Sequence, residues 1–167
     1  ATIVREVIMK RLTAVIMLIL TGAIIFASNT ISFSGRYALV GSDGRTIRRT
    51  SADIEGTGVV LATGEEKAKA EGSAFSLVLG ENSLAAIKDE EGLVIYLVYG
   101  NATVVSGEER DVTVYTPTTK TTLYSKGEYH FISLDREEKA YNFSSPDIQL
   151  YDSIRGTCTT LSYNEGY

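Results

Sequence analysis

Residues 12–27, LTAVIMLILTGAIIFA, contain no charged side chain and constrain this chain more than any other feature. They are apolar on every helical face, which argues against a surface helix with a single apolar stripe. A helix of this length spans about 24 Å, at about 1.5 Å per residue. The hydrocarbon core of a bilayer is about 30 Å thick, but residues 7–9 add apolar length and the basic side chains of Lys10 and Arg11 can snorkel. We therefore predict one membrane-spanning helix.

The predicted helix is flanked by charge on one side only. Its large apolar residues are the predicted membrane anchor: Leu12, Val15, Ile16, Leu18, Ile19, Leu20, Ile24, Ile25 and Phe26. The flanking basic residues are Arg5, Lys10 and Arg11. Cations beside a span favour the cytoplasmic side, so we expect a short cytoplasmic tail over residues 1–11. The rest of the chain would then be extracytoplasmic, in the periplasm outside the inner membrane. A cleaved signal peptide, which has the same pattern, is the alternative.

The composition of the whole chain excludes several classes of protein. The formal net charge is −5 and the pI is about 5.0, which argues against a nucleic-acid-binding surface. The chain has a single cysteine, Cys158, so no intrachain disulfide can form. Once the predicted helix is removed, the remaining length fits one ordinary domain. We predict a linker over residues 28–35 and one extracytoplasmic β domain over residues 36–167.

Short alternating segments separated by turn residues follow the apolar stretch and predict an all-β fold, either a short-strand sandwich or a roll. The expected strands are residues 36–40, 45–50, 57–63, 73–79, 83–87, 93–99, 102–105, 112–116, 120–124, 128–134, 139–143, 148–151 and 157–161. Residues 93–99, LVIYLVY, are apolar in both phases, which is typical of a central strand covered on both sides. Residues 64–71 read as a charged loop or single helical turn, and residues 162–167 have little to bury.

No residue pattern predicts a catalytic, cofactor or metal site, and we expect the protein not to be an enzyme. The only histidine, His130, lies within a predicted strand, and one His with one Cys cannot form a soft metal site. Runs of two or three acidic residues at 65–66, 89–91, 108–109 and 137–138 fall at predicted turns, where solvated charges are usual. Two carboxylates brought together by folding would be a glycosidase-like alternative.

The central block resembles the FecR-like domain family. The similarity is carried by the glycine-anchored segment GSAFSLVLG at residues 72–80, by NSLAAI at 82–87, and by strand 93–99 with Gly100. It continues through VTVYTP at 112–117 and YSKGEYHF at 124–131, where Glu128 replaces the family's usual Thr. The resemblance implies a periplasmic β domain on a single span. The family's name-giving members couple an outer-membrane receptor to a cytoplasmic sigma factor, but residues 1–11 are too few to form a sigma-binding domain.

The chain contains ten tyrosines and no tryptophan, and tyrosine is common on half-buried sheets and at interfaces. The candidate interaction surface is formed by Tyr96, Tyr99, Tyr115, Tyr124 and Tyr129. We predict a structural or assembly module that binds other envelope proteins, copies of itself, or both, and contacts lipid through its helix. The first alternative is a transmembrane signalling module of FecR type. The second is a pilin-like filament subunit, although Arg5, Lys10 and Arg11 would then be buried cations that each need an acidic partner.

The basic tail separates assembly from signalling. If the chain signals, its receiver must be another membrane helix, and replacing Arg5, Glu6, Lys10 and Arg11 abolishes the signal. If the chain serves assembly, the same replacements change only insertion or topology. Membrane fractionation combined with a signalling readout distinguishes the two outcomes.

Overall fold

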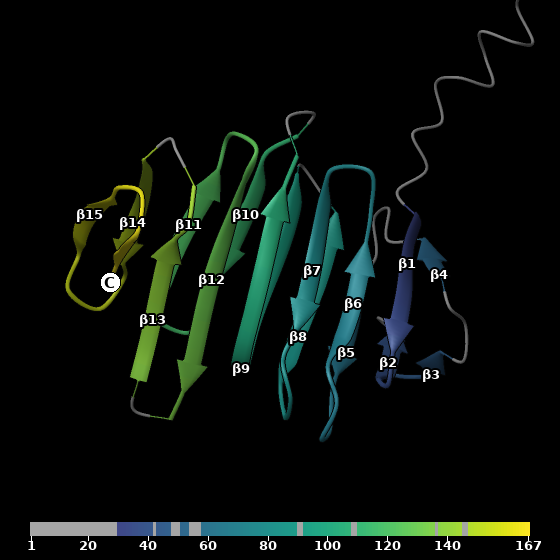
Figure 1. Ribbon diagram of the computed structural model, residues 1–167. Coiled ribbons are helices and arrows are strands. Elements are labelled where there is room, and N and C mark those ends of the chain that lie inside the picture. Colours follow the sequence, from purple (N-terminus) through teal and green to yellow (C-terminus); the bar gives the residue numbers. More distant parts are fainter. Residues whose placement is uncertain are drawn as a thin grey trace, which may run out of the picture.

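The computed structural model describes residues 30–41, 43–47, 51–53, 58–89, 92–107, 110–135, 137–144 and 147–167, and every regular element in these ranges is a β-strand (Figure 1). The all-β expectation is confirmed for these ranges. The predicted helix over residues 12–27 and its basic flank lie outside the described residues. Within the described ranges, no helix has the length and apolar character needed to cross a bilayer.

The strands form two stacked sheets (Figure 1). Sheet A has the strand order β4 (Ser51–Asp53), β1 (Thr30–Gly35), β6 (Ala68–Glu71), β7 (Phe75–Leu79), β9 (Leu93–Ser106), β12 (Gly127–Leu134), β13 (Glu137–Asn142) and β16 (Glu165–Gly166). Sheet B has the order β3 (Thr46–Ile47), β2 (Ala38–Gly41), β5 (Gly58–Ala62), β8 (Leu84–Asp89), β9, β10 (Val112–Tyr115), β11 (Thr119–Leu123), β14 (Ile148–Asp152) and β15 (Thr157–Leu161).

From β5 onward, the chain adds strands to the two sheets alternately and in sequence order. Hairpin β6–β7 joins sheet A, β10–β11 joins sheet B, β12–β13 joins sheet A, and β14–β15 joins sheet B. Both sheets therefore lengthen in the same direction, from the end that holds β1 to β4 toward the end that holds β15 (Figure 1).

Strand β9 is shared by both sheets and changes sheet at Gly100. Its first half pairs with β8 and, in parallel, with β10, while its second half pairs with β7 and β12. Gly100 has a φ of +97°, a conformation that L side chains rarely adopt. Its Cα also lies against buried Ser83, whose hydroxyl accepts a hydrogen bond from the Asn101 N–H at 3.0 Å. The expected interruption at Gly100 is thus a bend within one strand.

The core lies between the sheets and is formed by alternate residues of each strand. Its largest fully buried members are Tyr129, Phe131, Ile31, Leu39, Leu61, Leu77, Leu79, Ile87, Ile95, Leu97 and Leu123. Tyr37 and Tyr167, which lie near opposite ends of the described chain, pack against this core while partly exposed.

Asp89 is a charged residue within the buried set, which corrects the expectation that it is a surface acid; residues 90 and 91 lie outside the described residues. Its side chain is 4% exposed and forms a bidentate ion pair with Arg110, with Nη1–Oδ2 at 2.5 Å. The pair joins the end of β8 to the segment before β10. A buried carboxylate is tolerated here because both of its oxygens accept from the guanidinium fork.

Four further sequence expectations are corrected by the strands. Residues 30–35 of the expected linker form β1, because Ile31 and Phe33 alternate with Ser and Thr and are buried. The expected charged loop at 64–71 ends in β6, whose alanines, Ala68 and Ala70, are buried members of the core. Strand β9 is central, as expected, but only one of its faces is covered in sheet B, because Tyr96 and Val98 are 42% and 48% exposed. The tail forms β16 against β13.

We predict that Gly100→Ala strongly destabilises the fold. An added Cβ would lie 2.7 Å from the Ser83 Cα, and alanine would also have to adopt the unfavourable φ. We expect a loss of about 2–4 kcal/mol in the free energy of unfolding. The matched control is Gly64→Ala, whose Cβ has no neighbour within 4 Å, with an expected change below about 0.5 kcal/mol. Thermal unfolding of the full chain in mild detergent measures both, and equal stability of the two variants would contradict the assigned role of Gly100.

Candidate interaction surface

The outer face of sheet B, which points away from sheet A, carries a continuous line of cross-strand neighbours. Strand register places these residues side by side on the same face, because side chains alternate along each strand. We call this line the tyrosine row, and it consists of Val40, Val60, Ala86, Tyr96, Tyr115, Lys120, Tyr151 and Cys158. It crosses the sheet from β2 to β15.

The centre of the tyrosine row is a stacked aromatic pair. The rings of Tyr96 and Tyr115 lie 5.0 Å apart between centroids with an interplanar angle of 13°, because the parallel pairing of β9 and β10 places them directly opposite. The Lys120 Nζ lies 5.6 Å from the centroid of the Tyr115 ring. Contacts of these kinds contribute about 0.5–1.5 kcal/mol each and hold the rings in one orientation. The face is thus pre-organised around an ordered aromatic centre.

The outer face of sheet B has no acidic residue among its described strand positions. Its outward residues are mostly valine, alanine, threonine and tyrosine, together with Leu84, Gln149 and Cys158, and the charged positions are Lys88 and Lys120. Sheet A differs, because its outward positions include the pairs Lys69–Glu71 and Lys139–Glu137 as well as Glu128. In a chain with 21 acidic residues, this leaves sheet B with one face whose described strand positions carry no acid.

The five predicted surface tyrosines have different positions. Tyr96 and Tyr115 are brought together at the centre of the row, Tyr99 is 41% exposed at the β9 bend, and Tyr124 is 71% exposed just after β11. Tyr129 lies fully buried on the inward phase of β12, so its assignment to the surface is wrong; burial raises the pKa of its phenol.

Sequence reasoning missed six of the eight members of the row, among them the three that follow Tyr115 across the sheet: Lys120, Tyr151 and Cys158. All three occupy outward positions of strands that were predicted, so their phase was available from the sequence. Their alignment with Tyr115 depends on strand register, which a local residue pattern does not specify.

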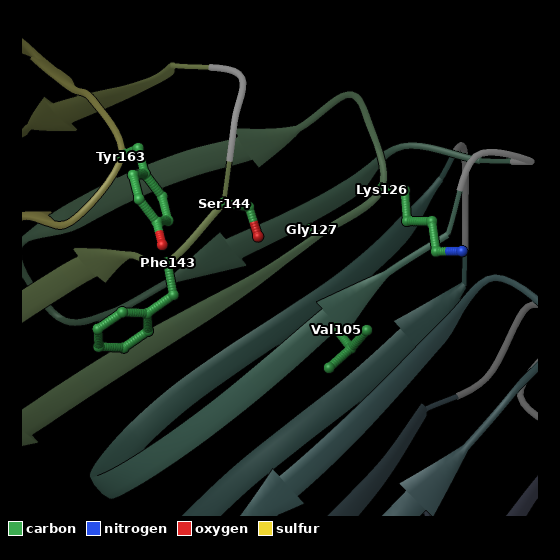
Figure 2. Close-up of a pocket in the computed structure, with 6 residues that line it drawn as sticks. All are labelled: Val105, Lys126, Gly127, Phe143, Ser144 and Tyr163. Atoms are coloured by element: carbon green, nitrogen blue, oxygen red, sulfur yellow. The ribbon is translucent and has the colours of Figure 1, made fainter.

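An open hollow of about 430 Å³ lies on the other side of the sandwich (Figure 2). It is lined by Val105, Lys126, Gly127, Phe143, Ser144 and Tyr163. Figure 2 shows Phe143 and Tyr163 at one side and Lys126 at the other. Its lining contains no carboxylate, thiol or imidazole, so these residues offer contact surface and provide no acid–base pair.

His130 lies on the outward phase of β12 beside its cross-strand neighbour Thr103. The Thr103 Oγ1 and the His130 Nδ1 are 3.0 Å apart, and burial lowers the pKa of the imidazole. Directly opposed residues on a sheet commonly form such hydrogen bonds. Within the described ranges, no group of three or more His, Cys, Asp or Glu side chains is arranged to hold a metal ion.

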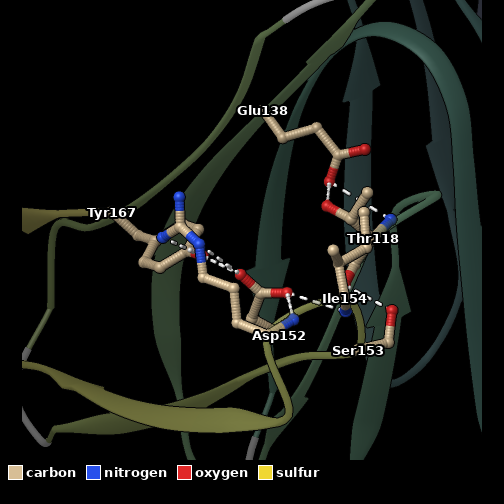
Figure 3. A network of polar contacts seen from close by, with 7 residues as sticks. Thr118, Glu138, Asp152, Ser153, Ile154 and Tyr167 are labelled. Atoms are coloured by element: carbon tan, nitrogen blue, oxygen red, sulfur yellow. Dashed lines mark hydrogen bonds and ion pairs between the residues drawn. The ribbon is translucent and has the colours of Figure 1, made fainter.

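A polar network fixes the end of the sandwich near β15 (Figure 3). The Tyr167 hydroxyl donates to the Asp152 carboxylate, which also accepts from the backbone N–H groups of Ile154 at 2.8 Å and Arg155 at 2.9 Å. Nearby, the Ser153 hydroxyl donates to the Thr118 carbonyl at 2.7 Å. The hydrogen bond from Tyr167 is the main reason why the pKa of Asp152 lies below its usual value, followed by the Arg155 N–H.

Comparison with known proteins identifies little. No family model matches this chain, and no curated protein matches it. Among solved structures it is similar to a "putative anti-sigma factor" from Parabacteroides distasonis ATCC 8503, with a TM-score of 0.46 and 9% identity, over 62% of this chain and 58% of that one. This chain therefore covers less than two thirds of that protein. The FecR-like resemblance stays a prediction.

We predict that Asp152 makes the fold sensitive to acid. A carboxylate whose pKa is lowered on folding contributes stability that is complete above the unfolded pKa of about 3.9 and is lost as pH falls through the native pKa. Asp152→Asn should therefore be less stable than wild type at pH 7, and the difference should shrink below about pH 4. Thermal unfolding between pH 7 and pH 2.5 measures this.

Tyr167→Phe is the companion variant. Removing the phenol donor should raise the pKa of Asp152 toward its usual value, so the loss of stability begins at a higher pH than in wild type. Identical pH profiles for wild type and both variants would contradict a role for this hydrogen bond.

Proposed function

We propose that this chain is a non-enzymatic docking module of the cell envelope. In this proposal, residues 12–27 hold it in the inner membrane with the β domain in the periplasm, and the outer face of sheet B binds a protein partner. The observation that carries the proposal is the tyrosine row, an acid-free line with a stacked aromatic pair at its centre, on a protein of net charge −5.

The physical properties of this face suit protein docking. Interface centres are depleted in charge and enriched in tyrosine, which supplies contact area at low conformational cost. Tyr96, Val98 and Tyr151 are each between 42% and 48% exposed in the isolated chain, so each has surface left to bury. The stacked pair is already ordered, which lowers the entropy that a partner must overcome.

The proposal covers two uses of the module, which differ in what the partner does. As an assembly protein, the chain is held permanently in a large particle of defined stoichiometry. As a signalling protein, it binds a partner transiently and transmits the event through its helix. A pilin-like subunit would instead be found in fibres on the cell surface.

We predict that the double variant Tyr96→Ser, Tyr115→Ser loses the partner. The chain is extracted from its native membrane in mild detergent, sized, and analysed by mass spectrometry for co-eluting proteins. Central interface tyrosines contribute about 2 kcal/mol or more, so recovery of a true partner should fall by roughly tenfold or more.

Tyr163→Ser is the matched control, because Tyr163 is 61% exposed and lines the hollow on the other side of the sandwich. It should leave recovery unchanged, and thermal unfolding should confirm that all variants are folded. Undiminished recovery of every partner by the double variant would reject this face as the docking site. A large particle of fixed composition supports assembly, whereas a small species with substoichiometric partner supports signalling.

A further inference from the structure

The outermost strand of sheet B, β15, is paired on one side only. It hydrogen-bonds with β14 from Ile148↔Leu161 to Asp152↔Thr157, and no described strand lies on its other side. In Figure 1 it forms the end of the sandwich, with the chain beyond it crossing to sheet A. An edge strand of this kind presents unpaired N–H and C=O groups to any strand of compatible shape.

Strand β15 lacks the features with which edge strands are usually protected. Its sequence, TCTTL, contains no charged residue, no proline and no glycine. Natural edges are commonly blocked by lysine, proline or a bulge, and the register of β15 with β14 is regular over all five pairs. The edge of sheet A at this end of the sandwich is different, because it is formed by the two-residue strand β16. The next residue, Tyr167, exchanges backbone hydrogen bonds with Ala140 of β13.

The chemistry of this edge matches a second copy of itself. Its outward side chains, Cys158 and Thr160, are small and uncharged, and each contacts Gln149 of β14: the thiol donates to its Oε1 at 3.1 Å, and its Nε2 donates to Thr160 at 2.8 Å. Two copies related by a two-fold axis would therefore bring together neutral, hydrogen-bonding surfaces. The described strand positions on the outer face of sheet B carry no acid, so pairing of two β15 strands would not bring acidic side chains of the two copies together on this face.

We propose that β15 pairs antiparallel with β15 of a second copy, about a two-fold axis that passes beside Thr159. Each Thr157 then lies opposite Leu161 of the other copy, and each Cys158 opposite Thr160. The two B sheets become one continuous sheet, and the two tyrosine rows face the same side. An interface of this type is isologous and closes as a dimer. The pairing does not depend on the docking role proposed above.

The single cysteine of the chain reports this geometry directly. Any thiol-specific cross-link between two chains must join two Cys158 residues, and Cys158 is exposed. In the proposed register these two residues are diagonal neighbours on one face, about 7–8 Å apart. The full chain in mild detergent is treated with a bismaleimide of about 8 Å reach, and its mass is measured by size-exclusion chromatography with light scattering. We expect a dimer that is captured by the cross-linker.

Thr160→Lys tests the edge itself. It places two lysines beside the two-fold axis, where like charges oppose pairing, and the dimer and the cross-link should both be lost. The matched control is Thr46→Lys on β3, the edge strand at the other end of sheet B, which should leave both unchanged. Because an apolar N-terminal segment can associate by itself, survival of the dimer in Thr160→Lys would overturn the proposal.

The remaining outcomes are equally decisive. A monomeric wild type without cross-link overturns the pairing. Higher oligomers that are lost in both edge variants indicate head-to-tail joining of β15 to β3 and also overturn it. The Tyr96→Ser, Tyr115→Ser variant should still dimerise, so a failure of the docking role and a failure of the edge pairing give different results.

Discussion

Strand β9 couples the two layers of this protein, and the rest of the structure depends on its change of sheet at Gly100. In its first half the strand gives β10 a parallel neighbour, and in its second half it gives β12 an antiparallel one. The hairpins that follow are placed by these two pairings. A side chain at position 100 would disturb Ser83, whose hydroxyl holds the Asn101 backbone. One glycine therefore aligns the two layers.

This coupling also determines which tyrosines meet on the surface. Parallel pairing of β9 with β10 is the reason that Tyr96 and Tyr115 lie opposite one another, although nineteen positions separate them in the sequence. Lys120 then follows through the β10–β11 register and Tyr151 through the β11–β14 register. The row exists only in the assembled sheet, because each strand contributes a single residue to it and no strand alone has an unusual composition.

The alternation of apolar residues predicted most strands, and residues 157–161 were predicted with the bounds that β15 has. It failed at residues 30–35, where Thr30, Ser32 and Ser34 alternate with Ile31 and Phe33 and make the segment resemble a linker. It also failed to give the inward phase of β12, because both phases of GEYHFISL contain large apolar or aromatic residues; Tyr129 was therefore placed on the wrong side. Register and phase are decided by neighbouring strands, so a local pattern could not reveal the surface.

The sequential order in which strands join the sandwich has a consequence for how the protein is made and how it can change. Each new hairpin binds to strands that precede it closely in the chain, so a growing polypeptide can add structure in the order of its synthesis. A layered architecture built in this way has no fixed length. Hairpins can be gained or lost in evolution at the far end, as in repeat proteins, while the layers already formed keep their packing.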